Sequence, residues 1–459
     1  MTRFCPVYPT PKARRASLLK LFFSARYSWL DSLFERSYTM HLGEVHLPSL
    51  DLYMVNEPAL VHRVLIEEVH HFPKSALLDA ALKPLLGDSI FTTNGAQWER
   101  QRRMMEPSFE QARLKSVFAS MSAAAHVMQM RLQQLLDRAN VDVEQEMTLV
   151  TADIIFRTIL STSLNEGDAG QIFNAFKQFQ RHVPKLISHR IFGIPSVFSP
   201  LLTKHRAGIF AQQIRSLLGQ AIAPRFAAFH AGMPDPHQDI LSELLKARDQ
   251  ATGQSFSSDE LLDQVTMLFL AGHETSASAL SWALYLLANS TEVQARCYDE
   301  VIAMQVNDQL TYATIRKLQL VRNVVRETLR LYPPVGFFAR QSQVTTMMRD
   351  KVVRRDAAIV VAPWLIHRHR TLWDKPDEFN PDRFACNDAR ESIKNAYLPF
   401  GLGPRVCIGA SFALQEATLI LATLIKHFRF EALANVQPKP VGRLTIRSDN
   451  GIQLRVCRR

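Results

Sequence analysis

The chain has 459 residues, of which 47% are hydrophobic and 21% are charged. This balance is typical of a globular protein with a sizeable core and excludes a disordered or collagen-like chain. The net charge of +11 favours an acidic partner or an anionic surface, but no nucleic-acid-binding motif accompanies it, so we expect no nucleic-acid partner.

The cysteines are scattered and form no recognisable zinc or disulfide pattern. There are five of them, none in a Cys-x-x-Cys pair, which favours a reducing compartment. No Gly/Ser-rich linker or internal repeat divides the chain, so we expect a single domain over residues 1–459. No run of ~20 apolar residues is present in the sequence, and we therefore expect no transmembrane anchor.

Residues 1–36 form an amphipathic N-terminal segment. Apolar residues recur at close to helical spacing from Arg14 to Tyr38, and the first acidic residue is Asp31. Dense aromatic residues favour a first helix packed on the domain, whereas an Arg-rich, acid-poor start also suits a membrane-surface helix or a mitochondrial presequence. We expect a cytoplasmic protein, with membrane contact or organelle targeting through residues 1–35 as the alternative.

The next elements are a hairpin, a helix and a loop. Residues 39–55 alternate and turn like a β-hairpin, and residues 57–68 predict a helix. Residues 76–97 show no clear periodicity and predict a loop. Trp98 and Arg102 open the following helix and share one of its faces, because they are four residues apart.

Residues 110–245 are predicted to be mostly helical, with breaks at proline and glycine positions. Large apolar residues gather around the first breaks, and either a mobile lid or plain core would produce such a cluster. Its members are Phe173, Phe176, Phe179, Ile191, Phe192 and Phe198.

A long central helix is predicted over residues 257–289. It begins at a capping box formed by Ser257 and Glu260, and ~32 residues at ~1.5 Å each would cross the whole domain. A polar Gly-His-Glu-Thr-Ser run at residues 272–276 interrupts its apolar sequence. Such a local exception predicts a functional site, although a Thr hydroxyl in a helix commonly bonds back to a helix carbonyl.

Charged residues at helical spacing follow downstream. Glu327 and Arg330 lie three residues apart, so they face each other on a helix and, if buried, must be fully paired. Residues 335–340 predict a strand, and residues 443–456 predict a closing hairpin about the turn at Asp449-Asn450-Gly451.

Cys407 lies at a predicted junction between a loop and a helix, in a unit that spans residues 400–427. Glycines and a proline precede it, and a helix-forming run follows Gly409. The positive end of that helix and the nearby Arg405 would favour the thiolate, which is a metal ligand or a nucleophile. The alternative is an ordinary buried cysteine.

The sequence from Phe400 to Gly409 resembles the haem-binding loop of the cytochrome P450 family, Phe-x-x-Gly-x-Arg-x-Cys-x-Gly. Four further segments resemble motifs of that family and occur in the same order. The matching residues are Phe400, Gly403, Arg405, Cys407 and Gly409 in the loop; Trp98 and Arg102; Ala271, Gly272, Glu274 and Thr275; Glu327 and Arg330; and Pro381, Arg383 and Phe384. The chain departs from the family at residues 354–357, where Pro-x-Gly is common.

The resemblance implies a mainly α fold with a small β region (α+β), in which haem b lies between the long helix and the Cys407 loop. Cys407 would be the axial ligand of the haem iron. The other roles implied are propionate contacts for Trp98, Arg102 and Arg340; cofactor binding in the haem loop for Phe400, Gly403, Arg405 and Gly409; close haem approach and a dioxygen groove for Ala271 and Gly272; proton relay for Glu274 and Thr275; scaffold for Glu327, Arg330 and Arg383; and substrate contact for Leu268, Ala271, Val335 and Phe338.

The function implied is that of a monooxygenase that inserts one atom of dioxygen into a small apolar substrate. Electrons would come from NAD(P)H through a separate ferredoxin or flavodoxin, which a basic surface attracts. The candidate basic residues are Arg100, Arg103, Arg322, Arg326 and Lys394. The alternatives are a haem-thiolate binding or sensor protein and a peroxide-driven or isomerising enzyme, and the intact pair Glu274 and Thr275 argues against both.

Overall fold

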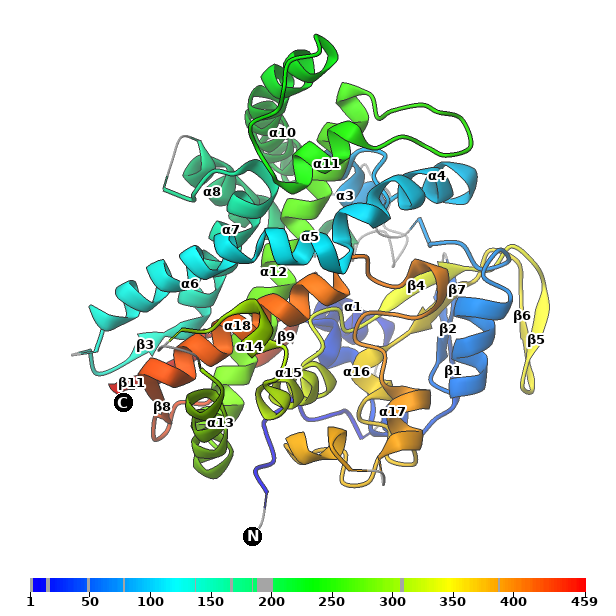
Figure 1. Ribbon diagram of the computed structural model, residues 1–459. Coiled ribbons are helices and arrows are strands. Elements are labelled where there is room, and N and C mark those ends of the chain that lie inside the picture. The colour runs from blue at the N-terminus through cyan, green and yellow to red at the C-terminus, as the bar shows by residue number, and fades with distance from the viewer. Residues whose placement is uncertain are drawn as a thin grey trace.

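The computed structural model describes residues 3–13, 17–47, 50–76, 79–136, 138–165, 168–183, 185–187, 201–305, 309–386 and 389–459. Helices dominate the described chain and surround a long central helix, while the largest sheet lies to one side (Figure 1). The prediction of a mainly α fold with a small β region is therefore confirmed.

The α-helices lie throughout the chain. They are α1 (Leu18–Tyr27), α2 (Pro58–His62), α3 (Asp79–Leu86), α4 (Gly95–Met105), α5 (Gln111–Ser116), α6 (Phe118–Gln133), α7 (Val143–Leu160), α8 (Ala169–Gln180), α10 (Leu201–His230), α11 (Ile240–Lys246), α12 (Ser258–Ala288), α13 (Thr291–Met304), α14 (Tyr312–Ile315), α15 (Gln319–Leu331), α16 (Pro363–Ile366), α17 (Arg390–Ala396) and α18 (Ala410–His427).

Short helical turns connect several of these elements. They are the 3-10 turns η1 (Trp29–Ser32), η2 (Glu35–Tyr38), η4 (Glu106–Phe109), η5 (Pro381–Phe384) and η6 (Gly403–Arg405), and the π-helical turn η3 (Arg63–Glu67). The strands are β1 (Leu42–Leu47), β2 (Leu50–Val55), β3 (Val141–Asp142), β4 (Phe338–Gln341), β5 (Thr346–Met348), β6 (Lys351–Val353), β7 (Ala358–Val361), β8 (Phe428–Ala432), β9 (Pro440–Gly442), β10 (Ile446–Ser448) and β11 (Gln453–Arg458).

Helix α12 runs through the middle of the molecule (Figure 1). Its N-terminus carries the predicted capping box, since the Ser257 hydroxyl accepts from the Glu260 N–H and the Glu260 carboxylate accepts from the Ser257 N–H at 2.9 Å. Most of its side chains are buried, and the buried ones occur on every face of the helix. A helix that is apolar all round belongs in a core, and this one forms the axis on which α7, α10, α15 and α18 pack.

The largest sheet has the strand order β1-β2-β7-β4. Strands β1 and β2 pair antiparallel, with Leu42 opposite Val55, which confirms the predicted hairpin. Strand β2 then pairs with β7 in parallel, and β4 closes the other edge. The predicted strand at residues 335–340 is shorter than expected because pairing begins only at Phe338.

The predicted closing hairpin over residues 443–456 is wrong. Strand β10 pairs with β9, whereas β11 pairs with β8 and β3. The turn between β10 and β11 bonds instead to Lys439, whose N–H donates to the Asn450 side chain at 2.8 Å and whose carbonyl accepts from the Asp449 N–H. These contacts turn the chain away from β10 before β11 begins.

Residues 3–13 pack against the domain. The Phe4 carbonyl accepts from the Phe379 N–H at 2.9 Å, and the Phe4 ring meets Tyr285 edge-on. In α1, Phe23 is 58% exposed. No helix in the part of the chain that the structure describes combines the length and apolar character needed to span a bilayer.

The apolar cluster near the predicted breaks is core where the structure describes it. Phe176 and Phe179 are buried, and the Phe176 ring stacks on Phe269 of α12. Ile191, Phe192 and Phe198, which the lid hypothesis also used, lie outside the described residues.

Candidate active site

The loop before Cys407 is shaped by two glycines in the left-handed backbone region. Gly401 has φ 77° and Gly403 has φ 74°, a region that other residues rarely adopt. A Cβ atom on Gly403 would also overlap the carbonyl oxygen of Leu65, whereas one on Gly401 would meet nothing within 4 Å. The Cys407 N–H donates to the Phe400 carbonyl at 2.9 Å and closes the loop.

Cys407 lies two residues before Gly409, the N-cap residue of α18. Cys407 as a residue keeps some exposed surface, but its sulfur is buried, and this burial raises the pKa of the thiol. The Gly409 N–H and the Arg102 charge lower the pKa, but by less. The N–H group at the helix end thus acts in the predicted direction, but in the protein alone burial outweighs it. A coordinated metal cation deprotonates a thiol outright, so this sulfur suits a metal better than a free nucleophilic role.

The arginines expected to bind the haem converge near this loop. Arg102 donates to the Val406 carbonyl at 2.7 Å. Arg405 lies 4.2 Å from the centre of the Trp98 ring and donates to the Asn94 side chain at 2.9 Å. Trp98, Arg102 and Arg405 are thus brought together as the sequence suggested.

Arg340 completes this cationic group. It is 7% exposed, and its Nε atom is buried without a hydrogen-bond partner. Burial and the positive charge of Arg405 lower the pKa of Arg340 to about 10, and burial also lowers the pKa of Arg405 to about 10. Within the described ranges, no carboxylate lies at ion-pair distance from either of them. A buried cation with an unused donor and a partly buried cation beside it fit the carboxylate groups of a haem, so the residues present suit that cofactor.

Helix α12 exposes surface at one point of its otherwise buried middle. Ala271 is exposed between the buried residues Leu270 and His273. Gly272 faces the other way, because a Cβ atom there would overlap the Ile155 side chain of α7. Ala271 can therefore take the predicted role beside the haem, while the small size of Gly272 is explained by contact between the helices α12 and α7.

Thr275 lies one turn after Ala271, and its hydroxyl donates to the Ala271 carbonyl at 2.7 Å. This is the bond that Thr commonly makes within a helix, and the oxygen can still accept a hydrogen bond. His273 bonds to the Phe269 carbonyl at 2.6 Å and is buried. No group of three or more metal-ligating side chains occurs among the described residues.

Glu274 is buried and held by several partners. Arg447 donates to both of its carboxylate oxygens, at 3.0 and 2.8 Å, and Thr445 donates at 2.7 Å. The Gln180 amide donates at 3.0 Å. Burial alone would raise the pKa of Glu274, but the Arg447 charge and hydrogen bonds outweigh it and lower the pKa to about 2. Sequence reasoning missed all three partners, because none lies at a recognisable spacing from Glu274.

The expected ion pairs behind the cysteine loop are present. The Arg330 guanidinium donates to both Glu327 oxygens at 2.8 Å, and both side chains are fully buried. Arg383 donates to the same carboxylate at 3.4 Å. The remaining N–H groups of the two arginines donate to main-chain carbonyls of residues 367 and 374–378. These bonds compensate the excess positive charge.

The expected substrate contacts lie in different environments. Val335 is 38% exposed, and Phe338 is partly buried with its ring under the Arg340 guanidinium. Leu268 is buried in the main core. Ala271 and Val335 therefore offer exposed apolar surface, whereas Leu268 offers little.

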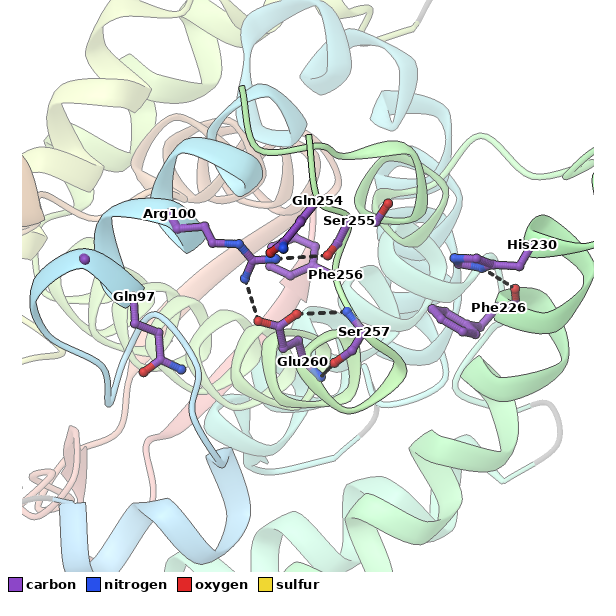
Figure 2. A pocket seen from close by; sticks show the side chains of 10 residues that line it. Gln97, Arg100, Phe226, His230, Gln254, Ser255, Phe256, Ser257 and Glu260 are labelled. Atoms are coloured by element: carbon purple, nitrogen blue, oxygen red, sulfur yellow. Dashed lines mark hydrogen bonds and ion pairs between the residues drawn. The ribbon is translucent and has the colours of Figure 1, made fainter. Parts of the chain in front are cut away.

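A separate surface pocket of about 700 Å³ lies among α4, α10 and the start of α12. Figure 2 shows that Arg100 and Glu260 point toward each other across it, and their ion pair measures 2.6 Å. His230 and Phe226 form another part of its wall. None of the predicted haem or substrate residues lines this pocket.

The basic residues expected to attract an electron donor differ in availability. Arg100 is engaged by Glu260, and Arg103 pairs with Asp249 at 3.0 Å. The Arg322 guanidinium donates to the Arg316 carbonyl, and burial together with the positive charges of Arg326 and Arg316 lowers the pKa of Arg322. Lys394 is exposed on α17. The cluster of Arg316, Arg322 and Arg326, on α15 and just before it, is therefore the stronger candidate surface for an electron donor.

Comparisons with known proteins agree with this geometry. The family model described as "Cytochrome P450" matches residues 24–455. "Cyclooctatin synthase" from Streptomyces melanosporofaciens is 30% identical over 88% of this chain and 86% of its own length. "Cyclooctat-9-en-7-ol 5-monooxygenase" from the same organism is 29% identical over 84% and 82%.

A solved structure, the haem domain of cytochrome P450DA, superposes with a TM-score of 0.80 at 25% identity, covering 91% of this chain and 90% of that one. The two chains therefore share the same fold. The Cys407 loop, the α12 motif and the family match agree, and the chain belongs to the cytochrome P450 family and is a haem-dependent monooxygenase of that family.

Proposed function

We propose that the protein is a haem b monooxygenase that inserts one atom of dioxygen into a small apolar organic substrate, with electrons that come from NAD(P)H through a separate ferredoxin or flavodoxin. Residues 1–459 would act as one domain. The observation that carries the proposal is the arrangement of Cys407 beside Arg102, Arg405 and Arg340, with Glu274 and Thr275 on α12.

Cys407 would hold the haem iron, and Arg340, Arg405, Arg102 and Trp98 would hold the haem carboxylates. When bound, a haem with a thiolate ligand supplies the oxidising chemistry, since the anionic sulfur favours O–O cleavage. The protein positions the substrate and moves protons. Thr275 would present its hydroxyl oxygen at the exposed surface beside Ala271, and Glu274 would supply the ionisable group that such a relay needs.

The substrate class is supported by the apolar surface at Ala271, Val335 and Phe338 and by one relative. That relative is named as a monooxygenase acting on cyclooctat-9-en-7-ol, and we propose an apolar molecule of comparable chemistry here. The electron donor is supported by the cluster of Arg316, Arg322 and Arg326, which would attract an acidic surface. A cytoplasmic location stays a prediction from the sequence.

The first test is the absorbance spectrum of the dithionite-reduced, carbon monoxide-bound protein. Wild type is expected to show a strongly red-shifted Soret band, Cys407→Ser is expected to lose it, and Cys386→Ser is the control because Cys386 is also free and exposed. Equal spectra for wild type and Cys407→Ser would refute the ligand assignment.

Turnover then separates the proposed reaction from its rivals. With isotopically labelled dioxygen, NAD(P)H and a donor system, one labelled atom is expected in the product. Product formed with peroxide but not with dioxygen and NAD(P)H would favour the peroxide-driven alternative, and binding without turnover would favour a sensor.

A further inference from the structure

Glu274 poses a problem for proton relay. Its pKa of about 2 keeps it ionised near neutral pH, and its carboxylate oxygens are occupied by Arg447, Thr445 and Gln180. A carboxylate held in this way has little tendency to take up a proton. Something must therefore loosen its main partner, Arg447, if Glu274 is to act in the relay.

Arg447 of β10 is shared between two carboxylates from different elements. Its Nε and Nη2 atoms donate to Glu274 at 3.0 and 2.8 Å, while its Nη1 atom donates to Glu144 of α7 at 3.2 Å. Thr148 receives a further, longer bond of 3.4 Å from Nη1. One guanidinium thus bridges the inner carboxylate on α12 and a second carboxylate in the first turn of α7.

Glu144 is the weaker acid of the two. Burial raises the pKa of Glu144 to about 7 despite the Arg447 charge, and the negative charges of Asp142 and Glu274 add to the rise. The charged and titratable groups around the pair are Asp142 of β3, Glu274 and His273 of α12, and Arg447 of β10. On α6, Arg131 is directed elsewhere, because it pairs with Glu146 at 3.0 Å.

The two carboxylates also differ in access to solvent. The Glu144 side chain is 15% exposed and that of Glu274 is 11% exposed, and Glu144 lies in the first turn of α7 next to the exposed Gln145. Glu144 is therefore the better placed of the two to exchange a proton with water.

We propose that Glu144 and Arg447 are positioning residues that control the protonation of Glu274 through this shared guanidinium. When Glu144 is protonated, Arg447 forms an ion pair with Glu274 alone. When Arg447 turns toward Glu144, the Glu144 carboxyl loses its proton and the Glu274 carboxylate gains one. The exchange conserves charge, because Arg447 stays cationic throughout, and it needs no other reactant. This inference rests on the proposed relay role of Glu274.

The first test is an infrared titration of the carboxyl C=O bands in the holoenzyme. Wild type minus Glu144→Gln is expected to isolate one band with an apparent pKa of about 7. In Glu274→Gln, the same band is expected to titrate at least about one pH unit lower, because Arg447 then pairs with Glu144 alone and a like charge is gone.

Glu146→Gln is the matched control, since it removes a carboxylate from the same helix that pairs with Arg131 and not with Arg447. It is expected to leave the Glu144 band unchanged. A Glu144 band that titrates identically in wild type and Glu274→Gln would overturn the proposed coupling, whether or not the enzyme turns over any substrate.

The second test is the pH dependence of product formation relative to peroxide release. Wild type is expected to change through pH about 7, whereas Glu144→Gln is expected to be flat and to form product about tenfold more slowly, a modest part of what proton transfer can contribute. Glu146→Gln should follow wild type. A Glu144→Gln profile equal to that of wild type would overturn the control of Glu274. Absence of turnover in every variant would instead refute the proposed function and leave the infrared result to decide the coupling.

Discussion

Replacement of Gly403 by Ala, compared with the same change at Gly401, tests the architecture of the cysteine loop. The two glycines share nearly the same backbone conformation, with φ 74° and 77°, so each substitution should cost about 1–2 kcal/mol of conformational strain. The two positions differ in the free space that a Cβ atom would have. The new Cβ atom at Gly403 would overlap the Leu65 carbonyl and lie 3.0 Å from the Ile66 side chain, while the one at Gly401 meets nothing within 4 Å.

The extra overlap at Gly403 resembles an overpacked core site, which typically costs a further ~1–3 kcal/mol. We therefore expect Gly401→Ala to lower the free energy of unfolding by about 1–2 kcal/mol and Gly403→Ala to lower it by roughly twice as much or more. Because Leu65 cannot move away without displacing η3, the loop itself should shift.

Denaturant titration measures the stability of both variants, and the reduced carbon monoxide spectrum reports the position of Cys407. Gly401→Ala should keep the red-shifted Soret band, and Gly403→Ala should lose part of it. If the two variants had equal stability and equal spectra, the contact between Gly403 and Leu65 would not be what requires glycine there.

Two further predictions concern buried carboxylates. Glu327→Gln leaves the buried Arg330 and Arg383 without a counter-charge, and denaturant titration should show that the free energy of unfolding falls by about 3 kcal/mol. Glu431→Gln is the control, because it breaks a partly exposed pair with Arg429 and should cost less than about 1 kcal/mol. Equal losses in the two variants would contradict this reasoning. Burial raises the pKa of Glu416 to about 8, and the hydrogen bond from Ser276 opposes the rise. Because this pKa is higher in the folded than in the unfolded protein, the neutral carboxyl stabilises the fold at low pH, and that stability is lost as the pH rises toward 8. Wild type should thus lose up to about 1.4 kcal/mol per pH unit in this window, Glu416→Gln should lose less in the same titration, and parallel pH profiles would count against a raised pKa.

The sequence was sufficient where a local pattern determines the structure. The capping box at Ser257 and Glu260 forms as predicted, and α12 ends at Ala288. Glu327 and Arg330 face each other because helical spacing alone requires it. The cysteine loop could be located because its glycines and proline prevent a helix before Cys407.

The remaining features depend on neighbours that are distant in the sequence. Nothing near Glu274 indicates that Arg447 will bind it. The side of α12 that Gly272 occupies is decided by Ile155 of α7. The closing hairpin prediction was wrong because the turn bonds to Lys439. Burial around Cys407, which opposes the thiolate, is a property of the whole fold that no local pattern indicates.

The docking of residues 3–13 has a consequence for how the chain reaches its native state. The Tyr332 hydroxyl bonds to the Val7 carbonyl over 325 positions, and the Tyr8 hydroxyl bonds to Asp377 over 369. Closing so long a loop adds little to its entropic cost, because that cost grows only with the logarithm of length. The long sequence separation of these contacts slows folding, however, since they require most of the intervening chain to be in place. Residues 3–13 can therefore reach their binding surface only after α15 and the segment around Asp377 have been synthesised.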